Sequence, residues 1–296
     1  MNPKHIILTL LLMLCPIGMA AQSTITRHKP KPAVTKPKPA AKPKAKPAPR
    51  RNSTHHSSST SSTVSLSAEL NKLINNMVYV SSGTFTMGAT SEQGSDAESD
   101  EKPTHSVTLS SYYICKYEVT QALWRAVMGS NPSNFKGDNL PVELVSWDDC
   151  QTFINRLNSY TGRNFRLPTE AEWEFAARGG NYSRHYKYSG SNYISDVAWY
   201  DGNSGNRTHP VGTKQANELG LYDMSGNVYE WCSDGYGSYS SYSQNDPTGP
   251  NSGSRRVPRG GSWRNNAKYC RSSCRDNYAP GDRGYYLGLR LVLSHL

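Results

Sequence analysis

The stretch that follows Gly180 constrains the fold most, because it contains no apolar-periodic segment longer than about five residues. Gly, Asn, Ser, Tyr and Pro dominate its composition. A long irregular stretch inside a compact domain needs buried tryptophans, polar networks or bound metal ions to hold it in place. We therefore predict an α+β fold of high loop content, with one core, because residues 77–296 are enough for a single domain.

Regular elements are predicted before Gly180. We expect strands at residues 77–80, 83–88 and 106–113, and an acidic loop at 91–101. Helix ends are marked by Ser or Thr caps and by Gly stops. The three expected helices run from Thr120 to Gly129, from Ser146 to Gly162, and from the capping-box sequence at Thr169 to Gly179-Gly180.

The N-terminus, residues 1–21, has the pattern of a secretory signal peptide. Lys4 gives the segment a basic start, and an apolar run follows from Ile6 to Ile17. Ala20 and Ala21 then supply the small residues that signal peptidase needs. The apolar run is short for a bilayer span, which disfavours the alternative of a membrane anchor. Cys15 raises a second alternative, a lipoprotein, but its neighbours Leu14 and Pro16 do not suit a lipid-modification site. Export to the periplasm, the outer surface or the medium is therefore predicted.

Residues 22–65 form a basic, Pro- and Ser-rich tether that is predicted to be disordered, because it cannot bury enough apolar area to offset the entropy of ordering. A short helix is expected at residues 66–76, leading into the globular domain at 77–296. The chain carries a formal net charge of +10, but residues 1–68 hold eleven of the 33 Lys and Arg and none of the 23 acids. The domain itself is thus nearly neutral.

This charge distribution argues against a nucleic-acid partner, since the folded part has no basic excess and an exported chain meets no nucleic acid. Anionic polymers of the cell envelope are the expected partner of the tether, with a plain solvated spacer as the alternative. Five of the six cysteines follow the predicted signal peptide. Disulfides are permitted after export, and an odd number leaves at least one thiol without a partner in the chain.

A set of short sequence strings between Tyr117 and Arg290 identifies a family. The strings are Tyr117-Glu118-Val119-Thr120, Pro141-Val142-Glu143, Val145-Ser146-Trp147, Arg166-Leu167-Pro168-Thr169-Glu170-Ala171-Glu172-Trp173-Glu174, Pro210-Val211-Gly212, Gly220-Leu221-Tyr222-Asp223-Met224-Ser225-Gly226-Asn227-Val228-Tyr229-Glu230-Trp231, Arg259-Gly260-Gly261-Ser262-Trp263, Cys270-Arg271-Ser272 and Gly288-Leu289-Arg290. In this order they resemble the formylglycine-generating enzyme family, also called sulfatase-modifying-factor domains. The resemblance covers nearly the whole folded part and implies a variant of the C-type-lectin fold.

The resemblance also implies bound calcium. Asp223 and Glu230 supply carboxylates, which are the hard oxygen ligands that calcium prefers. Gly226 and Val228 match positions where the family uses main-chain carbonyls. The alternative is a structural turn whose acids cap backbone amides. A second family calcium site would fall, across an alignment gap, on Asp196, Val197, Asn203 and Gly205.

The oxidases of this family convert a sulfatase cysteine to formylglycine and bind one copper(I) between two cysteines. The second of these cysteines matches Cys270, and Ser262 of the Gly-Gly-Ser motif is retained. Asn265 stands where the first cysteine belongs, and an amide cannot replace a thiolate in a two-thiolate copper(I) site. Cys274 lies on the wrong side of Cys270 to substitute for it. Copper and oxidase activity are therefore not expected, and Cys270 and Ser262 are catalytic candidates only under the oxidase alternative, whose partner would be a sulfatase polypeptide.

The favoured interpretation is a non-oxidase binding or scaffold domain for a protein or glycan ligand at the cell envelope. Loops rich in Tyr, Ser, Gly and Asn after Tyr182 and Ser233 suit adaptable recognition, although plain soluble loops have the same composition. A further alternative is a receptor diversified by a retroelement, with a variable surface between Arg264 and Tyr286 and with Cys274 at one of its exposed tips. The candidate ligand-contacting residues are Arg264, Asn265, Asp276, Tyr278 and Tyr285.

Overall fold

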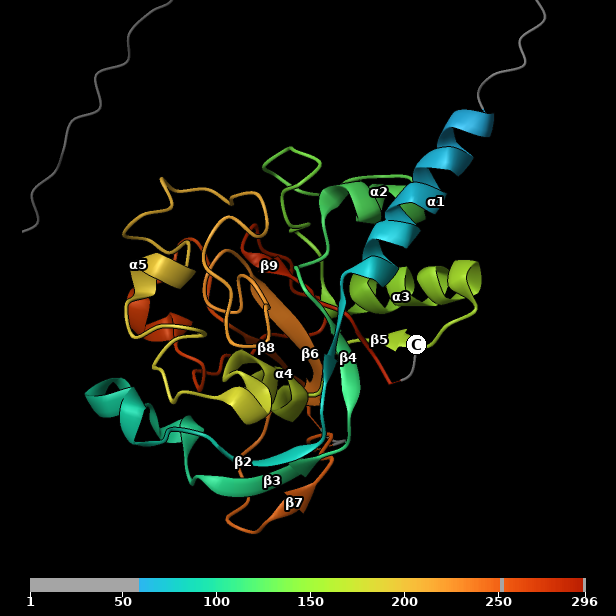
Figure 1. Cartoon of the computed structure of the whole chain (residues 1–296). Helices are drawn as coiled ribbons and strands as arrows, with labels where there is room; N and C mark the ends of the chain where they lie inside the picture. The colour runs from blue at the N-terminus through green and yellow to red at the C-terminus, as the bar shows by residue number, and fades with distance from the viewer. Residues whose placement is uncertain (1–58, 251–252, 295–296) are drawn as a thin grey trace, which may run out of the picture. The chain divides into compact units, whose positions relative to one another are not determined.

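A computed structural model describes residues 59–250 and 253–294 (Figure 1). The predicted signal peptide and most of the predicted tether lie outside these residues. In the described part, no helix has the length and apolar character needed to cross a membrane.

The first helix, α1 (Ser59–Asn75), begins inside the range that was predicted to be tether, so the boundary at residue 66 was too late. Its C-terminal half is anchored by Leu66, Leu70, Leu73 and Ile74, which follow helical spacing and pack against one of the two main hydrophobic clusters. Once such a helix is nucleated, adding a further turn at its N-terminus costs little. Helix α1 lies against α2 (Gln121–Met128), as Figure 1 shows.

The predicted helices and their caps are confirmed. Thr120 caps α2 and Gly129 ends it with φ +78°; α3 (Trp147–Thr161) begins after Ser146 and ends before Gly162. Helix α4 (Glu170–Ala177) has the predicted capping box at Thr169. A short helix, α5 (Ile194–Val197), was not predicted. Turns of 3-10 helix are η1 (Ser91–Asp96) and η2 (Ser99–Glu101) in the expected acidic loop, η3 (Gly180–Tyr182) and η4 (Ala267–Cys270).

A four-stranded antiparallel sheet joins the two ends of the domain. Its order is β1 (Met77–Val80), β4 (Tyr112–Cys115), β10 (Val292–Leu293) and β5 (Phe165–Arg166). Val292 lies opposite both Ile114 and Arg166. Strand β10 therefore lies between β4 and β5, two strands that come much earlier in the chain.

The single strand predicted at 106–113 is instead two strands in different sheets. Strand β3 (His105–Leu109) pairs with β2 (Gly83–Met87) and with β7 (Gln244–Asn245), whereas β4 belongs to the first sheet. The break falls at Ser110, whose N–H and hydroxyl both donate to Asp246, each at 2.7 Å. The alternating pattern continued across this break and hid it.

The third sheet holds β8 (Arg256–Arg259), β6 (Tyr229–Gly235) and β9 (Leu287–Gly288). Strand β6 has 7 residues and was not predicted, because the sequence after Gly180 contains no apolar-periodic segment of that length. All but Ser233 of these residues are buried, and a strand covered on both faces shows no alternation in its sequence.

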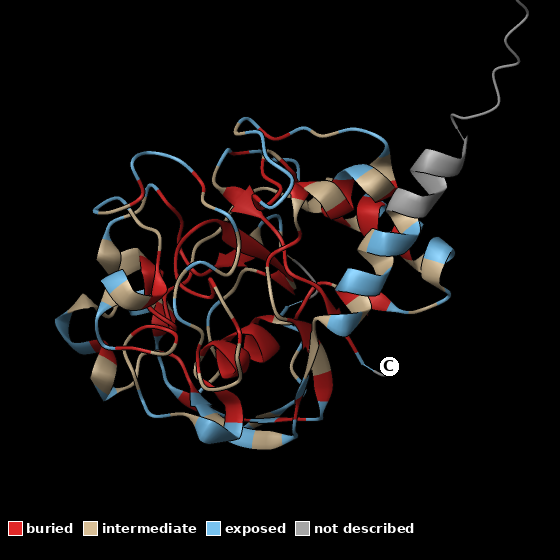
Figure 2. Ribbon diagram, turned by 45° about the horizontal axis from the view of Figure 1, so that its top comes forward, coloured by how far each residue is buried: buried red, intermediate tan, exposed pale blue. Residues whose placement is uncertain are grey.

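Helix α4 contacts both the β2–β3 pair and the β6–β8 pair, and all of its residues are buried (Figures 1 and 2). Around it, three fully buried arginines are paired with carboxylates: Arg259 with Glu174, Arg271 with Glu101 at 2.5 Å and Arg290 with Glu230 at 2.6 Å. These ion pairs, together with the buried Trp173 and Trp231, hold the irregular half. The five cysteines of the described residues are all buried and unpaired.

Candidate ligand-binding site

The predicted ligand surface is centred on a group of aromatic rings around Trp263. Its ring stacks on Tyr285 at 5.9 Å between centroids, and Tyr286 lies 5.7 Å from Tyr285. The Trp263 indole N–H donates to the Tyr285 carbonyl at 2.8 Å. Because Trp263 itself is only 6 % exposed, it forms a rigid base, and Tyr285, at 42 %, is the exposed ring.

Arg264 lies over this aromatic group. Its guanidinium is 4.9 Å from the Tyr286 centroid and 5.5 Å from that of Tyr285, within the range of a cation–π interaction. It also donates to the Tyr285 hydroxyl at 3.3 Å. The side chain is exposed, so its charge remains accessible to a ligand.

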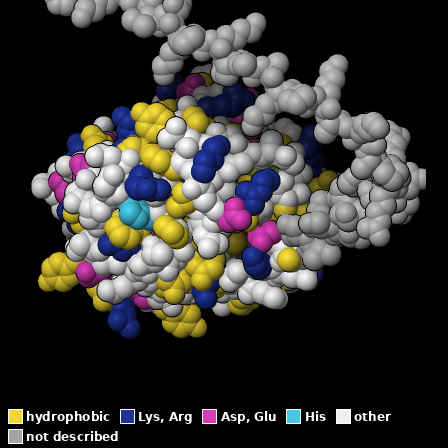
Figure 3. All heavy atoms as spheres, turned by 90° about the horizontal axis from the view of Figure 1, so that it is seen from above, with side chains coloured by type: hydrophobic (Ala, Val, Ile, Leu, Met, Phe, Trp, Pro, Cys, Tyr) yellow, Lys and Arg dark blue, Asp and Glu magenta, His cyan; other side chains and the backbone are white. Residues whose placement is uncertain are grey.

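Two further residues extend the surface, and the sequence analysis missed both. Phe135 packs edge-on against Trp263 at 5.6 Å, and Arg207 lies 5.9 Å from the Phe135 ring. Figure 3 shows Lys and Arg side chains interspersed with hydrophobic ones on one face of the molecule. Nothing in the sequence around Phe135 or Arg207 indicates that these loops meet Trp263.

The other predicted surface residues contribute less exposed area. Tyr278 is partly buried and packs edge-on against Trp231 at 6.2 Å. Burial raises the pKa of the Tyr278 phenol, and the charge of Asp276 raises it further. Asp276 is also partly buried, and desolvation raises the pKa of its carboxyl. Tyr278 also contacts Tyr286, at 6.0 Å between ring centroids, so it joins the aromatic group to the interior. Arg264 and Tyr285 form the accessible part of the group.

Asn265 takes part in a local hydrogen bond at the position where the oxidases have their first copper cysteine. Its side-chain oxygen accepts from the Ser262 hydroxyl. Cys270 is fully buried, and desolvation raises the pKa of its thiol, so the group is a neutral thiol at pH 7. One buried thiol beside an amide does not make a two-thiolate copper(I) site.

Close packing surrounds Cys270. A Cβ added at Gly261, which has φ +71°, would lie 2.7 Å from the Cys270 sulfur and 2.8 Å from the Tyr269 carbonyl. Cys274 is 1 % exposed, so its predicted place at an exposed variable tip is wrong. Burial raises the pKa of Cys274 to about 12. Both thiols therefore belong to the packed interior of this segment.

The first predicted calcium site lies in a tight turn, where Asp223 has φ +58° and Gly226 has φ +82°. Oδ2 of Asp223 accepts from the Gly212 N–H at 2.7 Å, whereas Oδ1 is buried and has no hydrogen-bond partner. Such an orphaned buried acceptor suits a hard cation. Desolvation raises the pKa of Asp223 to about 6, with a contribution from Glu230.

The remaining acids of this turn are already bound. Both oxygens of Glu230 accept from Arg290, and Oε2 also accepts from Trp173 at 2.7 Å. Glu118 caps the turn by accepting from Asn227 at 2.6 Å and from the Val228 N–H at 3.1 Å. Within the described residues no group of three His, Cys, Asp or Glu is placed to hold a metal. A calcium ion here would therefore depend on Asp223 and on the carbonyls of Gly226 and Val228.

At the second predicted calcium site, Asp196 and Asn203 have other partners. Asp196 accepts from the Ser191 hydroxyl at 3.1 Å. The Asn203 amide closes its own loop, accepting from the Tyr200 N–H and donating to the Ala198 carbonyl, each at 3.0 Å. No buried side-chain atom of Asp196 or Asn203 lacks a hydrogen-bond partner, and the site stays a prediction from the resemblance.

Known proteins share this fold and much of this sequence. The chain is 38% identical over 238 residues to the chaperone protein LppX of Paenibacillus barcinonensis, covering 64% of this chain and 82% of that protein. It is 29% identical over 294 residues to the formylglycine-generating enzyme of Mus musculus, covering 75% and 76% of the two chains.

Among solved structures, Treponema denticola variable protein 1 superposes with a TM-score of 0.67 at 36% identity, covering 74% of this chain and 95% of that one. PvdO from Pseudomonas aeruginosa gives a TM-score of 0.64 at 29% identity over 74% and 94% of the two chains. These neighbours confirm the single-domain, C-type-lectin-like fold. The family model for the sulfatase-modifying factor enzyme 1-like domain matches residues 63–295. The chain therefore belongs to the sulfatase-modifying-factor family of formylglycine-generating-enzyme-like domains.

Proposed function

We propose that this protein is an exported, non-oxidase binding domain that presents the surface around Arg264 and Tyr285 to a protein or glycan ligand at the cell envelope. The observation that carries the proposal is the arrangement of Arg264, an exposed cation lying over two tyrosine rings whose base is the buried Trp263. Tyrosine supplies large contact area at low entropic cost, and both tyrosine and arginine are enriched among the residues that carry most of the binding energy at interfaces.

Two similarities support a binding role. One relative is named a chaperone protein, which is a binding activity, and one structural neighbour is named a variable protein. The second name favours the alternative of a diversified receptor, whose accessible variable positions would be Arg264 and Tyr285 in place of the buried Cys274. The diversified-receptor alternative predicts two features in the neighbouring DNA. These are a near-copy of this coding segment with Asn codons at those positions, and a reverse-transcriptase gene beside it. If both are absent, the surface is not diversified.

The oxidase alternative requires a second thiolate, and by the family resemblance Asn265 stands where that cysteine belongs. The basic tether belongs to the same proposal, as a segment that contacts anionic envelope polymers.

Export itself is tested by fractionation and N-terminal sequencing. Cleavage after Ala21 leaves Gln22 as the first residue, whereas an uncleaved chain or a lipid on Cys15 contradicts the signal-peptide assignment.

Binding is tested with the purified chain on a glycan array and on envelope preparations. Arg264→Ala and Tyr285→Ala are expected to lose binding with a change in stability of at most about 0.5 kcal/mol, because both side chains are exposed. Tyr193→Ala is the matched control, since Tyr193 is 75 % exposed and lies outside the surface. Equal binding by all three variants would contradict the proposal.

A further inference from the structure

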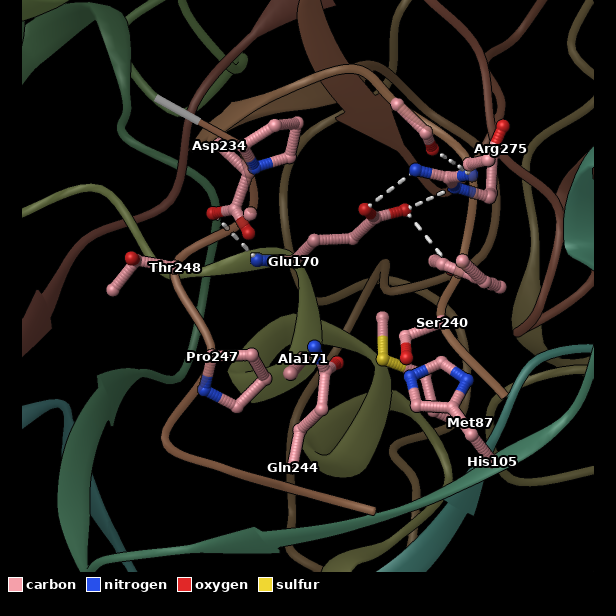
Figure 4. A pocket seen from close by; sticks show the side chains of 15 residues that line it. Met87, His105, Glu170, Ala171, Asp234, Ser240, Gln244, Pro247, Thr248 and Arg275 are labelled. Atoms are coloured by element: carbon pink, nitrogen blue, oxygen red, sulfur yellow. Dashed lines mark hydrogen bonds and ion pairs between the residues drawn. The ribbon is translucent and has the colours of Figure 1, made fainter. Parts of the chain in front are cut away.

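A cavity of about 430 Å³ lies between α4, β3 and the loop that follows β6 (Figure 4). Its polar lining includes His105, Glu170, Asp234, Gln244, Thr248 and Arg275. Tyr239, Met87 and Pro247 supply apolar walls. The aromatic group around Trp263 contributes no residue to this cavity.

One wall of the cavity is an ion network in which every charge is already satisfied. Arg275 donates to both oxygens of Glu170, at 2.6 and 2.9 Å, and the Tyr239 hydroxyl donates to Glu170 at 3.1 Å. Nη1 of Arg275 donates to the main-chain carbonyls of Asp100 and Gly237, at 2.9 and 3.0 Å. Glu170 and Arg275 are therefore structural, and neither has spare charge for a ligand.

Asp234 is different, although it is only 3 % exposed. Its Oδ2 accepts from the Glu170 N–H at 3.0 Å and from the Ser233 hydroxyl at 2.9 Å. No Lys, Arg or His of the described residues forms an ion pair with Asp234, and its Oδ1 accepts no hydrogen bond. The charge of Asp234 acts on Arg166, but that guanidinium is bound to Glu172 at 2.7 Å. In Figure 4 the carboxylate points between Glu170 and Thr248, two other lining residues.

A buried carboxylate without a counter-ion is costly, and it is usually paired or protonated. Burial, and next the charge of Glu170, raise the pKa of Asp234 to about 7. A cation in the cavity would supply the missing counter-charge. The remaining lining is compatible with a bound cation. The positive charge of Arg275 is neutralised by Glu170, and the side chains of His105, Gln244 and Thr248 carry hydrogen-bond acceptor atoms.

We propose that this cavity binds a primary ammonium or guanidinium group, of the kind carried by a Lys or Arg side chain of a polypeptide, with Asp234 as its counter-ion. The apolar walls formed by Tyr239, Met87 and Pro247 accommodate the methylene stem of such a side chain. The site is separate from the Arg264 surface, so each proposal can fail while the other stands.

The test uses the full chain and calorimetric titration with Nα-acetyl-lysine methylamide, Nα-acetyl-arginine methylamide and the uncharged norleucine analogue. We expect both cationic probes to bind and the norleucine probe not to bind. Asp234→Asn should weaken binding at least tenfold, whereas Asp201→Asn, which removes the same charge from an exposed position, should leave it unchanged. Butylamine is a fourth probe that carries an ammonium group but no peptide backbone. If it binds more weakly than the lysine probe, the site is selective for peptides; if it binds equally well, the site is one for small amines.

A second variant covers the case in which Asp234→Asn fails to fold. Thr248 is exposed at the cavity, so Thr248→Lys should fold and place an ammonium group beside Asp234 that blocks both probes. Thr248→Gln is its uncharged control and should still bind. Binding of the norleucine probe as strong as that of the lysine probe, unchanged binding in Asp234→Asn, or unchanged binding in Thr248→Lys would overturn the proposal.

Discussion

The hydroxyl of Ser262 donates a hydrogen bond to the side-chain oxygen of Asn265. In the family's oxidases, position 265 matches a copper cysteine. Here the same turn closes through a neutral amide, and the nearby Cys270 is buried as a neutral thiol. This hydrogen bond spans Trp263 and Arg264 and closes the turn that carries them.

The first prediction is that the purified protein does not make formylglycine. A Cys-containing sulfatase peptide, incubated with protein, copper and oxygen, should keep its mass, because no pair of thiols is available for copper(I). Asn265→Cys is expected to restore copper(I) binding without restoring turnover, and Asn266→Cys, at the adjacent position, is the control. Loss of the peptide's sulfur with the unaltered protein would establish the oxidase alternative.

The second prediction concerns calcium. If Asp223 Oδ1 faces a calcium ion, a chelator should lower the melting temperature, because a ligand that binds only the native state stabilises it by about 2.7 kcal/mol at one hundred times its Kd. For a domain of this size that corresponds to roughly 5–10 °C. Asp223→Ala should remove the chelator effect and Asp201→Ala should keep it. Identical melting curves with and without chelator would make this acidic turn purely structural.

The third prediction follows from Glu143, which is fully buried. Oε1 accepts from the Phe135 N–H at 2.8 Å, while Oε2 has no partner, and burial raises the pKa of the carboxyl to about 7. A folded-state pKa above the unfolded value means that the stabilising contribution of the protonated form is present below pH 4.5 and is lost as pH rises through 7.

Glu143→Gln cannot ionise and should keep the bond to Phe135. Its free energy of unfolding in urea should equal that of the unaltered protein near pH 4.5 and exceed it at pH 8, by up to about 3 kcal/mol. Asp148→Asn, at an exposed carboxylate nearby, should not show this widening gap. A constant difference across pH would mean that Glu143 is ionised in the folded protein throughout.

The fourth prediction compares two ion pairs that join η1 and η2 to the C-terminal half of the chain. Arg271 and Glu101 are fully buried and form two hydrogen bonds, at 2.8 and 2.5 Å. Arg271→Ala should cost about 3–5 kcal/mol, because it leaves an unpaired buried carboxylate. Lys187→Ala breaks the partly exposed pair with Asp96 and should cost at most about 1 kcal/mol. Similar losses in chemical denaturation would contradict the assignment of Arg271 to the core.

The sequence alone determined the ends of α2, α3 and α4 and the family. Helix ends were predictable because a cap such as Thr120 or Thr169 bonds an N–H only three residues away. The strings from Tyr117 to Arg290 determined the family, since together they cover nearly every segment of the domain.

Only the tertiary structure decided which distant groups meet. Arg271 forms an ion pair with Glu101, which lies 170 positions earlier in the chain. Val292 pairs with Ile114 in the four-stranded sheet. Nothing near Asp234 in the sequence reveals that it is buried without a base, or near Cys274 that it lies in the interior. Burial and ion pairing depend on what packs against a residue from elsewhere in the chain, and local hydrogen-bonding patterns carry no information about those neighbours.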